Sequence, residues 1–233
     1  VRPKTEFPPD PLPSPVLRTK GTGHTEMDLY PIMQKLRQSI LDRFSTSFNA
    51  QELDSYLADT FPEGYPAIQR GVTYLGPGHE GSAGYSRDSN FYLSDWFNLG
   101  PNDFAIVYGA NHAATGKATY SSAAVYLDRV LTAGIADATT ADFAVNPHIV
   151  DLSMPPVPGI EKFYAWKIAR NCNGELACLE AKVDANHVAA CGNKIAANAP
   201  VRVGFRQYAE PATKVGPADA EMLYDRVIVF RPK

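Results

Sequence analysis

The spacing of apolar residues changes from helical to strand-like along the chain, and the helical part comes first. Apolar side chains recur every three or four residues around Pro31, whose missing N–H suits the first turn of a helix. They are Leu29, Ile32, Met33, Leu36, Ile40 and Phe44. Asn49 and Glu52 have the spacing of a capping box and predict a second helix, which Pro62 ends. The pattern therefore predicts a helical segment over residues 26–66 that packs on a sheet.

From about residue 70 onward, short apolar runs alternate with turn residues, which is the pattern of strands. The predicted strands cover residues 91–97, 103–109, 117–126, 163–170, 176–183, 201–208 and 223–230. No helical pattern separates them, so the crossover helices that a parallel sheet needs are missing. We therefore expect a mainly β domain over residues 67–233, an antiparallel β-sandwich of jelly-roll-like form. Residues 136–160 are expected to form a long surface connection.

A proline-rich arm, residues 1–25, precedes the helical segment. Its prolines are Pro3, Pro8, Pro9, Pro11, Pro13 and Pro15. Proline fixes φ and removes a hydrogen-bond donor, so the arm favours polyproline II over helix or inner strand. Two interpretations stay open: a linker or tail, or an ordered arm that wraps its own domain or docks on a neighbouring subunit. In the second case residues 1–20 mediate self-association.

Composition narrows the classes of function. With 45% hydrophobic and 11% aromatic residues, the chain can bury a sizeable core. Its formal net charge of −3 provides no global basic field, which argues against nucleic acid as a partner. No apolar run approaches the roughly 18 residues that a membrane helix needs, so no membrane insertion is expected.

The cysteines Cys172, Cys178 and Cys191 lie within 20 residues of one another. A short turn, Asn173-Gly174-Glu175, follows the first of them and predicts a hairpin that brings Cys172 and Cys178 within bonding distance. Cys191 competes as a partner for either one. A disulfide would indicate an extracytoplasmic location, secreted or in the cell envelope.

Zinc binding and free thiols are the alternative interpretations of these cysteines. Cys172, Cys178, His187 and Cys191 supply three thiolates and an imidazole, a legitimate tetrahedral set. Their spacing, C-x5-C-x8-H-x3-C, departs from the tight C-x2–4-C knuckle of structural zinc sites. We therefore favour the disulfide.

A small polar loop, residues 109–117, lies between two predicted strands and is the main candidate site. Its candidate catalytic residues are His112 as a general base and Lys117 as an anion stabiliser. The candidate ligand-binding residues are Asn111, His112, Thr115, Lys117 and Tyr120. If the loop over residues 76–81 lies beside it, His79, Glu80 and His112 would form a two-histidine, one-carboxylate metal site.

Aromatic residues in the predicted strands are a second candidate. Tyr120, Tyr126, Trp166 and Tyr208 are expected mainly in the core. A subset on one sheet face would form a stacking platform for sugars or flat ligands.

Five stretches of the chain carry a resemblance. They are Arg87-Asp88-Ser89-Asn90, residues 99–109, Ala118-Thr119-Tyr120, residues 164–172 and residues 205–217. Together they resemble uncharacterised bacterial secreted or envelope proteins, and the strand plan more distantly resembles a jelly-roll domain family of unassigned function. The resemblance implies a fold and a compartment, but no reaction.

Two functions therefore remain in competition. The first is a secreted or envelope β-sandwich that acts by binding or assembly, with a glycan, a small ligand or another copy of itself as partner, and without a cofactor. The alternative is a metal-assisted or acid–base enzyme with a loop-borne site at His79, Glu80, His112 and Lys117. Only the metal-assisted form requires a divalent cation.

Overall fold

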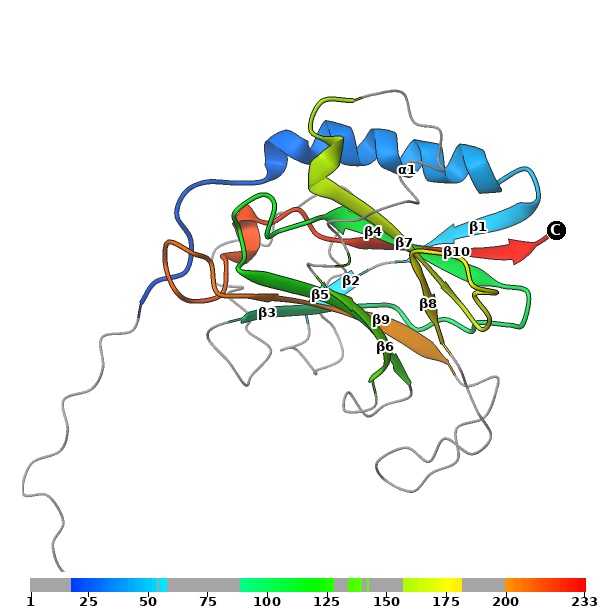
Figure 1. Ribbon diagram of the computed structural model, residues 1–233. Helices are drawn as coiled ribbons and strands as arrows, with labels where there is room; N and C mark the ends of the chain where they lie inside the picture. The colour runs from blue at the N-terminus through cyan, green and yellow to red at the C-terminus, as the bar shows by residue number, and fades with distance from the viewer. Residues whose placement is uncertain are drawn as a thin grey trace, which may run out of the picture.

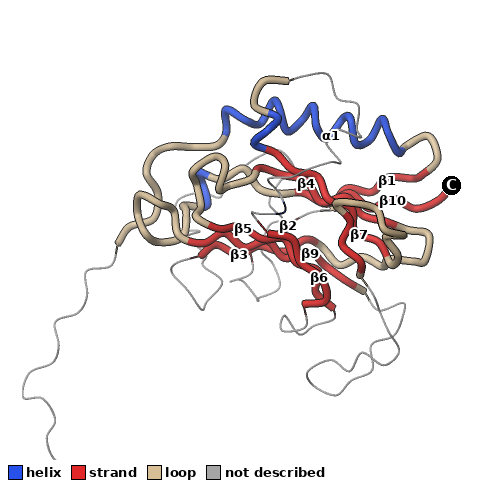
Figure 2. Tube along the Cα trace, in the orientation of Figure 1, coloured by secondary structure: helices blue, strands red, loops and turns tan. Residues whose placement is uncertain are grey.

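In the described part of the chain, two β-sheets form layers, and a helix lies on the outer face of the first sheet (Figure 1). The computed structural model describes residues 18–53, 55–57, 89–127, 134–139, 142, 157–181 and 200–233. Strands dominate these residues, as the colouring of Figure 2 shows. The prediction of a mainly β, largely antiparallel sandwich is confirmed. Residues 1–17 of the proline-rich arm lie outside the described residues.

The first sheet has five strands. In spatial order they are β1 (Phe48–Glu52), β10 (Arg226–Pro232), β4 (Phe104–Ala110), β7 (Phe163–Ala169) and β8 (Cys178–Glu180). The pairs β1–β10, β10–β4 and β4–β7 are antiparallel, and β7–β8 is parallel.

The second sheet also has five strands, and all of its pairs are antiparallel. In spatial order they are β2 (Ser55–Leu57), β3 (Ser89–Ser94), β9 (Val201–Tyr208), β5 (Tyr120–Leu127) and β6 (Gly134–Thr139). Three short 3-10 helices complete the described elements: η1 (Met27–Leu29), η2 (Ile160–Lys162) and η3 (Asp219–Glu221).

Helix α1 (Tyr30–Phe44) covers the outer face of the first sheet. Its buried residues Met33, Leu36 and Ile40 pack against one face of β4, while the alternate β4 residues Ala105 and Val107 face the second sheet. Successive side chains of a strand point to opposite faces. Since both faces of β4 are covered, its sequence is a continuous apolar run.

The core between the sheets is rich in aromatic rings. Tyr92 of β3 stacks on Phe205 of β9, with ring centroids 5.0 Å apart. Its edge also meets the ring of Tyr224 at 4.7 Å. Such pairs bury a large apolar area in the core.

The predicted second helix is wrong. Residues from Asn49 onward form β1 and then β2, one strand in each sheet. Ala50 and Gln51 pair with Phe230 and Val229 near the C-terminus. A capping box contributes only about 1 kcal/mol, and pairing with a distant strand outweighs it here.

Two other predictions about connections are corrected. Residues 136–139, expected in a surface connection, belong to β6, which pairs with β5. The predicted hairpin between β7 and β8 is not formed either, because β8 runs parallel to β7. Residues 143–156 lie outside the described residues.

Candidate functional site

The loop over residues 109–117 turns its polar side chains into the protein. Its buried polar residues are Asn111, His112 and Lys117. The side-chain oxygen of Asn111 accepts hydrogen bonds from the backbone N–H groups of Ala113 (3.2 Å) and Ala114 (3.3 Å). Asn111 therefore shapes the loop itself, as asparagine commonly does in turns.

His112 lies between two carboxylates and is 1% exposed. Its Nδ1 is 2.9 Å from a carboxylate oxygen of Glu26, and its Nε2 is 3.5 Å from Oδ2 of Asp225. Glu26 also accepts hydrogen bonds from the hydroxyl of Thr115 and from the backbone N–H of Leu223, the latter at 2.9 Å. These residues come from the N-terminal segment, the loop and the C-terminal segment, so the cluster ties three distant parts of the chain together.

The charge state of His112 follows from its neighbours. Burial lowers the pKa of His112, but the charges of Glu26 and Asp225 outweigh burial and raise the pKa to about 10. Burial likewise raises the pKa of Glu26, and the interaction with His112 outweighs it and lowers the pKa below its ordinary value. His112 is therefore an imidazolium at neutral pH, with no lone pair to accept a proton. The geometry gives no support to His112 as a general base.

Asp225 is enclosed by tyrosines and by a glycine. The hydroxyl of Tyr92 donates a hydrogen bond to Oδ2 of Asp225, and Gln207 donates to the same hydroxyl at 3.2 Å. Burial and the charge of Asp225 raise the pKa of Tyr92 and Tyr164 well above the ordinary value, so both stay neutral donors. A Cβ at Gly109 would lie 1.7 Å from Oδ1 of Asp225, so only glycine leaves room for this carboxylate.

Lys117 belongs to a second cluster of charges. Its ammonium is 2.7 Å from Glu210 and 2.5 Å from Glu221, and it donates to the hydroxyl of Thr22 at 3.2 Å. The backbone N–H groups of Thr22 and Gly23 also donate to Glu221, at 3.0 and 2.6 Å. Burial lowers the pKa of Lys117, and the hydrogen bonds to the two glutamates outweigh burial and raise it. Lys117 is thus engaged inside the protein.

Residues 20–26, which we call the N-terminal strap, contribute to both clusters. Glu26 supplies the carboxylate that holds Nδ1 of His112, and Thr22 supplies a hydroxyl to the Lys117 cluster. Lys20 donates to the side-chain oxygen of Asn90 at 2.7 Å. The described end of the predicted proline-rich arm therefore wraps its own domain.

The metal site and the enzyme predicted from the sequence include residues outside the described part of the chain. His79, Glu80 and the loop over residues 76–81 lie outside the described residues. In the part of the chain that the structure describes, no group of three or more His, Cys, Asp or Glu side chains is arranged to hold a metal ion. The enzyme alternative stays a prediction.

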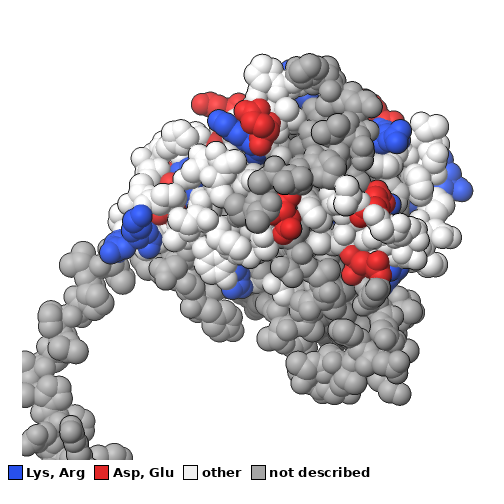
Figure 3. Space-filling model, in the orientation of Figure 1, with Lys and Arg blue, Asp and Glu red and all other residues white. Residues whose placement is uncertain are grey.

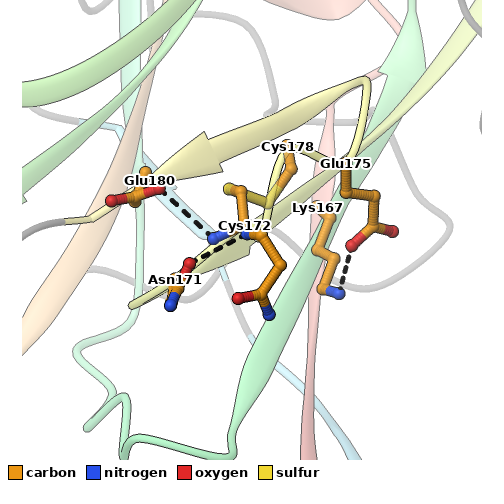
Figure 4. Close-up of a disulfide and its surroundings, with 7 residues drawn as sticks. Lys167, Asn171, Cys172, Glu175, Cys178 and Glu180 are labelled. Carbon is orange, nitrogen blue, oxygen red and sulfur yellow. Dashed lines mark hydrogen bonds and ion pairs between the residues drawn. A yellow bond between two sulfur atoms is a disulfide. The ribbon is translucent and has the colours of Figure 1, made fainter.

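The predicted disulfide between Cys172 and Cys178 is confirmed, with the two Cα atoms 5.8 Å apart. Figure 4 shows the bridge beside Glu180, which accepts a hydrogen bond from the backbone N–H of Cys172 at 3.3 Å. Because both thiols are used in the bridge, the zinc set with His187 and Cys191 is not formed. Cys191 itself lies outside the described residues.

The bridge closes a tightly turned loop instead of a hairpin tip. Asn173, Gly174 and Ala177 have positive φ angles of 50°, 78° and 51°. The chain does not return antiparallel after this turn, and β8 runs parallel to β7. Lys167 of β7 pairs with Glu175 of the loop at 2.6 Å (Figure 4).

The outer face of the second sheet carries an exposed aromatic group. Tyr120 of β5 lies opposite Tyr208 of β9, with ring centroids 5.6 Å apart. Arg206 donates to the hydroxyl of Tyr208 at 3.1 Å, and its guanidinium stacks 4.5 Å from the ring centre of Phe91. Tyr120 is 39% exposed. We call Tyr120, Tyr208 and Arg206 the aromatic platform.

The other aromatic residues singled out from the sequence divide between the sheets. Tyr126 lies on the same face of β5 as Tyr120, six residues further along the strand. Trp166 belongs to β7 in the first sheet and packs against the core between the sheets. The sequence could identify the aromatic residues, but it could not show that Tyr208 faces Tyr120, because β5 and β9 are far apart in the chain.

Comparison with known proteins finds no match: no family model, curated protein or solved structure is significantly similar to the chain. None of the helices in the described residues is long and apolar enough to cross a membrane. Acidic and basic side chains are interspersed over the face shown in Figure 3, and the described residues there form no continuous basic patch.

Proposed function

We propose that the protein is an extracytoplasmic glycan-binding protein whose site is the aromatic platform. The observation that carries the proposal is the exposed Tyr120 ring beside Tyr208 and Arg206 on the outer face of the second sheet. A tyrosine ring offers an apolar surface and a polar hydroxyl in one side chain. It therefore suits a ligand that is itself apolar on one face and polar at its edge.

A sugar ring has this character. Its axial C–H groups form an apolar face that stacks on an aromatic ring, while its hydroxyl groups at the edge take hydrogen bonds. Arg206 adds guanidinium donors whose direction is fixed by Tyr208 and by the ring of Phe91. Because Arg206 is a cation, we expect glycans with carboxylate or sulfate groups to bind more tightly than neutral ones.

The proposed extracytoplasmic location is inferred from the disulfide. A bridge such as Cys172–Cys178 persists in oxidising surroundings and is rare in the cytosol. Glycans are exposed on cell surfaces and in the matrix around them, so the compartment and the ligand class support each other.

Binding to immobilised neutral and acidic oligosaccharides tests the proposal. Replacing Tyr120 by Ala removes the exposed ring, and we expect affinity to fall about tenfold, a typical loss for an aromatic contact residue. The matched variant Tyr120→Phe keeps the ring and should retain most of the affinity. Thermal unfolding of both variants checks that the fold is unchanged.

Two outcomes would contradict the proposal. One is the absence of binding to any oligosaccharide in the panel. The other is a glycan that binds Tyr120→Ala as tightly as the unmodified protein, which would place the site elsewhere. Binding of flat aromatic compounds alone, tested in parallel, would assign the platform to another class of ligand.

A further inference from the structure

Strand β1 (Phe48–Glu52) forms one edge of the first sheet and pairs only with β10 among the described strands (Figure 1). Its central residues Asn49, Ala50 and Gln51 are exposed. An edge strand presents unpaired backbone N–H and C=O groups, which are a template for another strand.

The hydrogen-bond register shows which groups of β1 are free. Leu53 donates its backbone N–H to Val227 at 2.9 Å, and Lys233 donates to Ser47 at 3.2 Å. Hydrogen-bonded pairs alternate along an antiparallel ladder, so the odd-numbered residues of β1 are the ones that bond to β10. The backbone groups of the even-numbered residues point away from β10. They are Phe48, Ala50 and Glu52.

This edge lacks the features that natural proteins use to block edge pairing. It has no proline, no lysine and, in its register with β10, no bulge. The single charged side chain, Glu52, is held by Arg37 of α1 at 2.8 Å and by the hydroxyl of Tyr108 at 2.7 Å. Within the described residues, no hydrogen bond reaches the outward backbone groups of these three even-numbered residues.

We propose that β1 pairs antiparallel with β1 of a second copy of this chain, about a two-fold axis at Ala50. In this register Ala50 faces its own equivalent, and Phe48 faces Glu52 of the second copy. Each of these facing pairs exchanges two N–H···O=C bonds. The two five-stranded sheets then join into one continuous sheet.

The side chains of β1 are compatible with this self-pairing, and this favours a second copy of the chain over an unrelated strand. The residue on the axis is the small Ala50, so no bulky side chains collide there. Asn49 faces Gln51 of the second copy, and their amides can bond to each other. Glu52 faces an aromatic ring instead of another Glu52, so like charges are not opposed. The same patch serves both copies, as a two-fold interface requires.

The proposed dimer is independent of the glycan proposal and adds to it. Two aromatic platforms in one particle would bind a polysaccharide by two sites, which raises the apparent affinity without any new contact.

Sedimentation velocity of the full chain over a range of concentrations tests the dimer. Ala50→Pro removes an outward N–H and no bond to β10, so the fold is retained while the new ladder is blocked. We expect a concentration-dependent dimer for the unmodified protein and for the control Ala50→Ser, and a monomer for Ala50→Pro. Ala50→Lys keeps the backbone intact but places two like charges at the axis, and it should also weaken the dimer about tenfold. Circular dichroism monitors folding.

The dimer is overturned if the unmodified protein stays monomeric up to about 1 mM, where even a weak dimer is populated. It is also overturned if a dimer forms equally well with Ala50→Pro and Ala50→Lys. In that case the interface lies elsewhere, and deletion of residues 1–17 would test the arm.

Discussion

His112 keeps its proton because two carboxylates face it in a closed part of the protein. The sequence drew attention to His112 through its place in a small polar loop, but Glu26 and Asp225 lie far from it in the chain. No local pattern joins these three residues. By contrast, Cys172 and Cys178 are six positions apart, and their bridge could be predicted from the sequence because loop closure over so short a distance is a local property.

Replacing His112 by Gln should destabilise the protein strongly at pH 6. The change leaves Glu26 and Asp225 as buried carboxylates without a counter-charge, and breaking a buried ion pair in this way costs about 3–5 kcal/mol. Denaturant unfolding measures the loss. The control His24→Gln alters a side chain in the exposed part of the strap and should leave the free energy of unfolding unchanged.

The pH dependence separates this electrostatic effect from a packing defect. The pKa of His112 is raised from 6.5 to about 10, so its contribution is fully present below pH 6.5 and is lost as the pH rises toward 10. The pKa of Glu26 is lowered from 4.5, so its contribution is present above pH 4.5 and is lost as the pH falls through the lowered value. The difference in stability from His112→Gln should therefore be largest between pH 4.5 and 6.5. A constant difference up to pH 10 would show that packing alone is lost.

At the scale of elements, buried strands were easier to predict than edge strands. The interval 201–208 coincides with β9, whose residues are largely buried on both faces. Strand β1 is mostly exposed and carries a capping-box pattern, so its sequence indicates a helix, and only its pairing with β10 makes it a strand. The parallel course of β8 was equally unpredictable, because the turn residues Asn173 and Gly174 are just as typical of a hairpin. The left-handed backbone of Ala177 could not be predicted either, because alanine rarely adopts it.

Removing the bridge should loosen this loop and destabilise the protein moderately. In the chain-entropy model, a loop as short as that between Cys172 and Cys178 contributes about 2–3 kcal/mol. We expect the double variant Cys172→Ser/Cys178→Ser to lose this amount in denaturant unfolding. Alkylation of the denatured, unreduced protein should add one group, at the third cysteine. Three added groups would contradict both the bridge and the extracytoplasmic location.

At the scale of the whole molecule, the sandwich followed from the run of short strands without helices between them, which excludes a parallel sheet with crossovers. The order of strands within each sheet could not be predicted from this pattern, because β1 and β10 come from opposite ends of the chain. The role of the strap could not be predicted from the sequence either. Its sequence is small and polar, and its importance comes from the charges that it meets, Lys117 and His112, on distant segments.

Two deletions distinguish the strap from the rest of the proline-rich arm. Removing residues 1–17 leaves every described contact of the strap in place, so the free energy of unfolding should be unchanged. Removing residues 1–26 takes away Glu26 and Thr22. Among the described residues, Asp225 is then the remaining carboxylate that contacts His112, and the Lys117 cluster is open to solvent. The loss of a buried charge partner alone costs about 3–5 kcal/mol, so this shorter protein should melt at a much lower temperature or fail to fold.

Equal melting temperatures for the two deletions would show that the strap is dispensable. A change in mass by light scattering for the first deletion would instead restore the arm as an element of self-association.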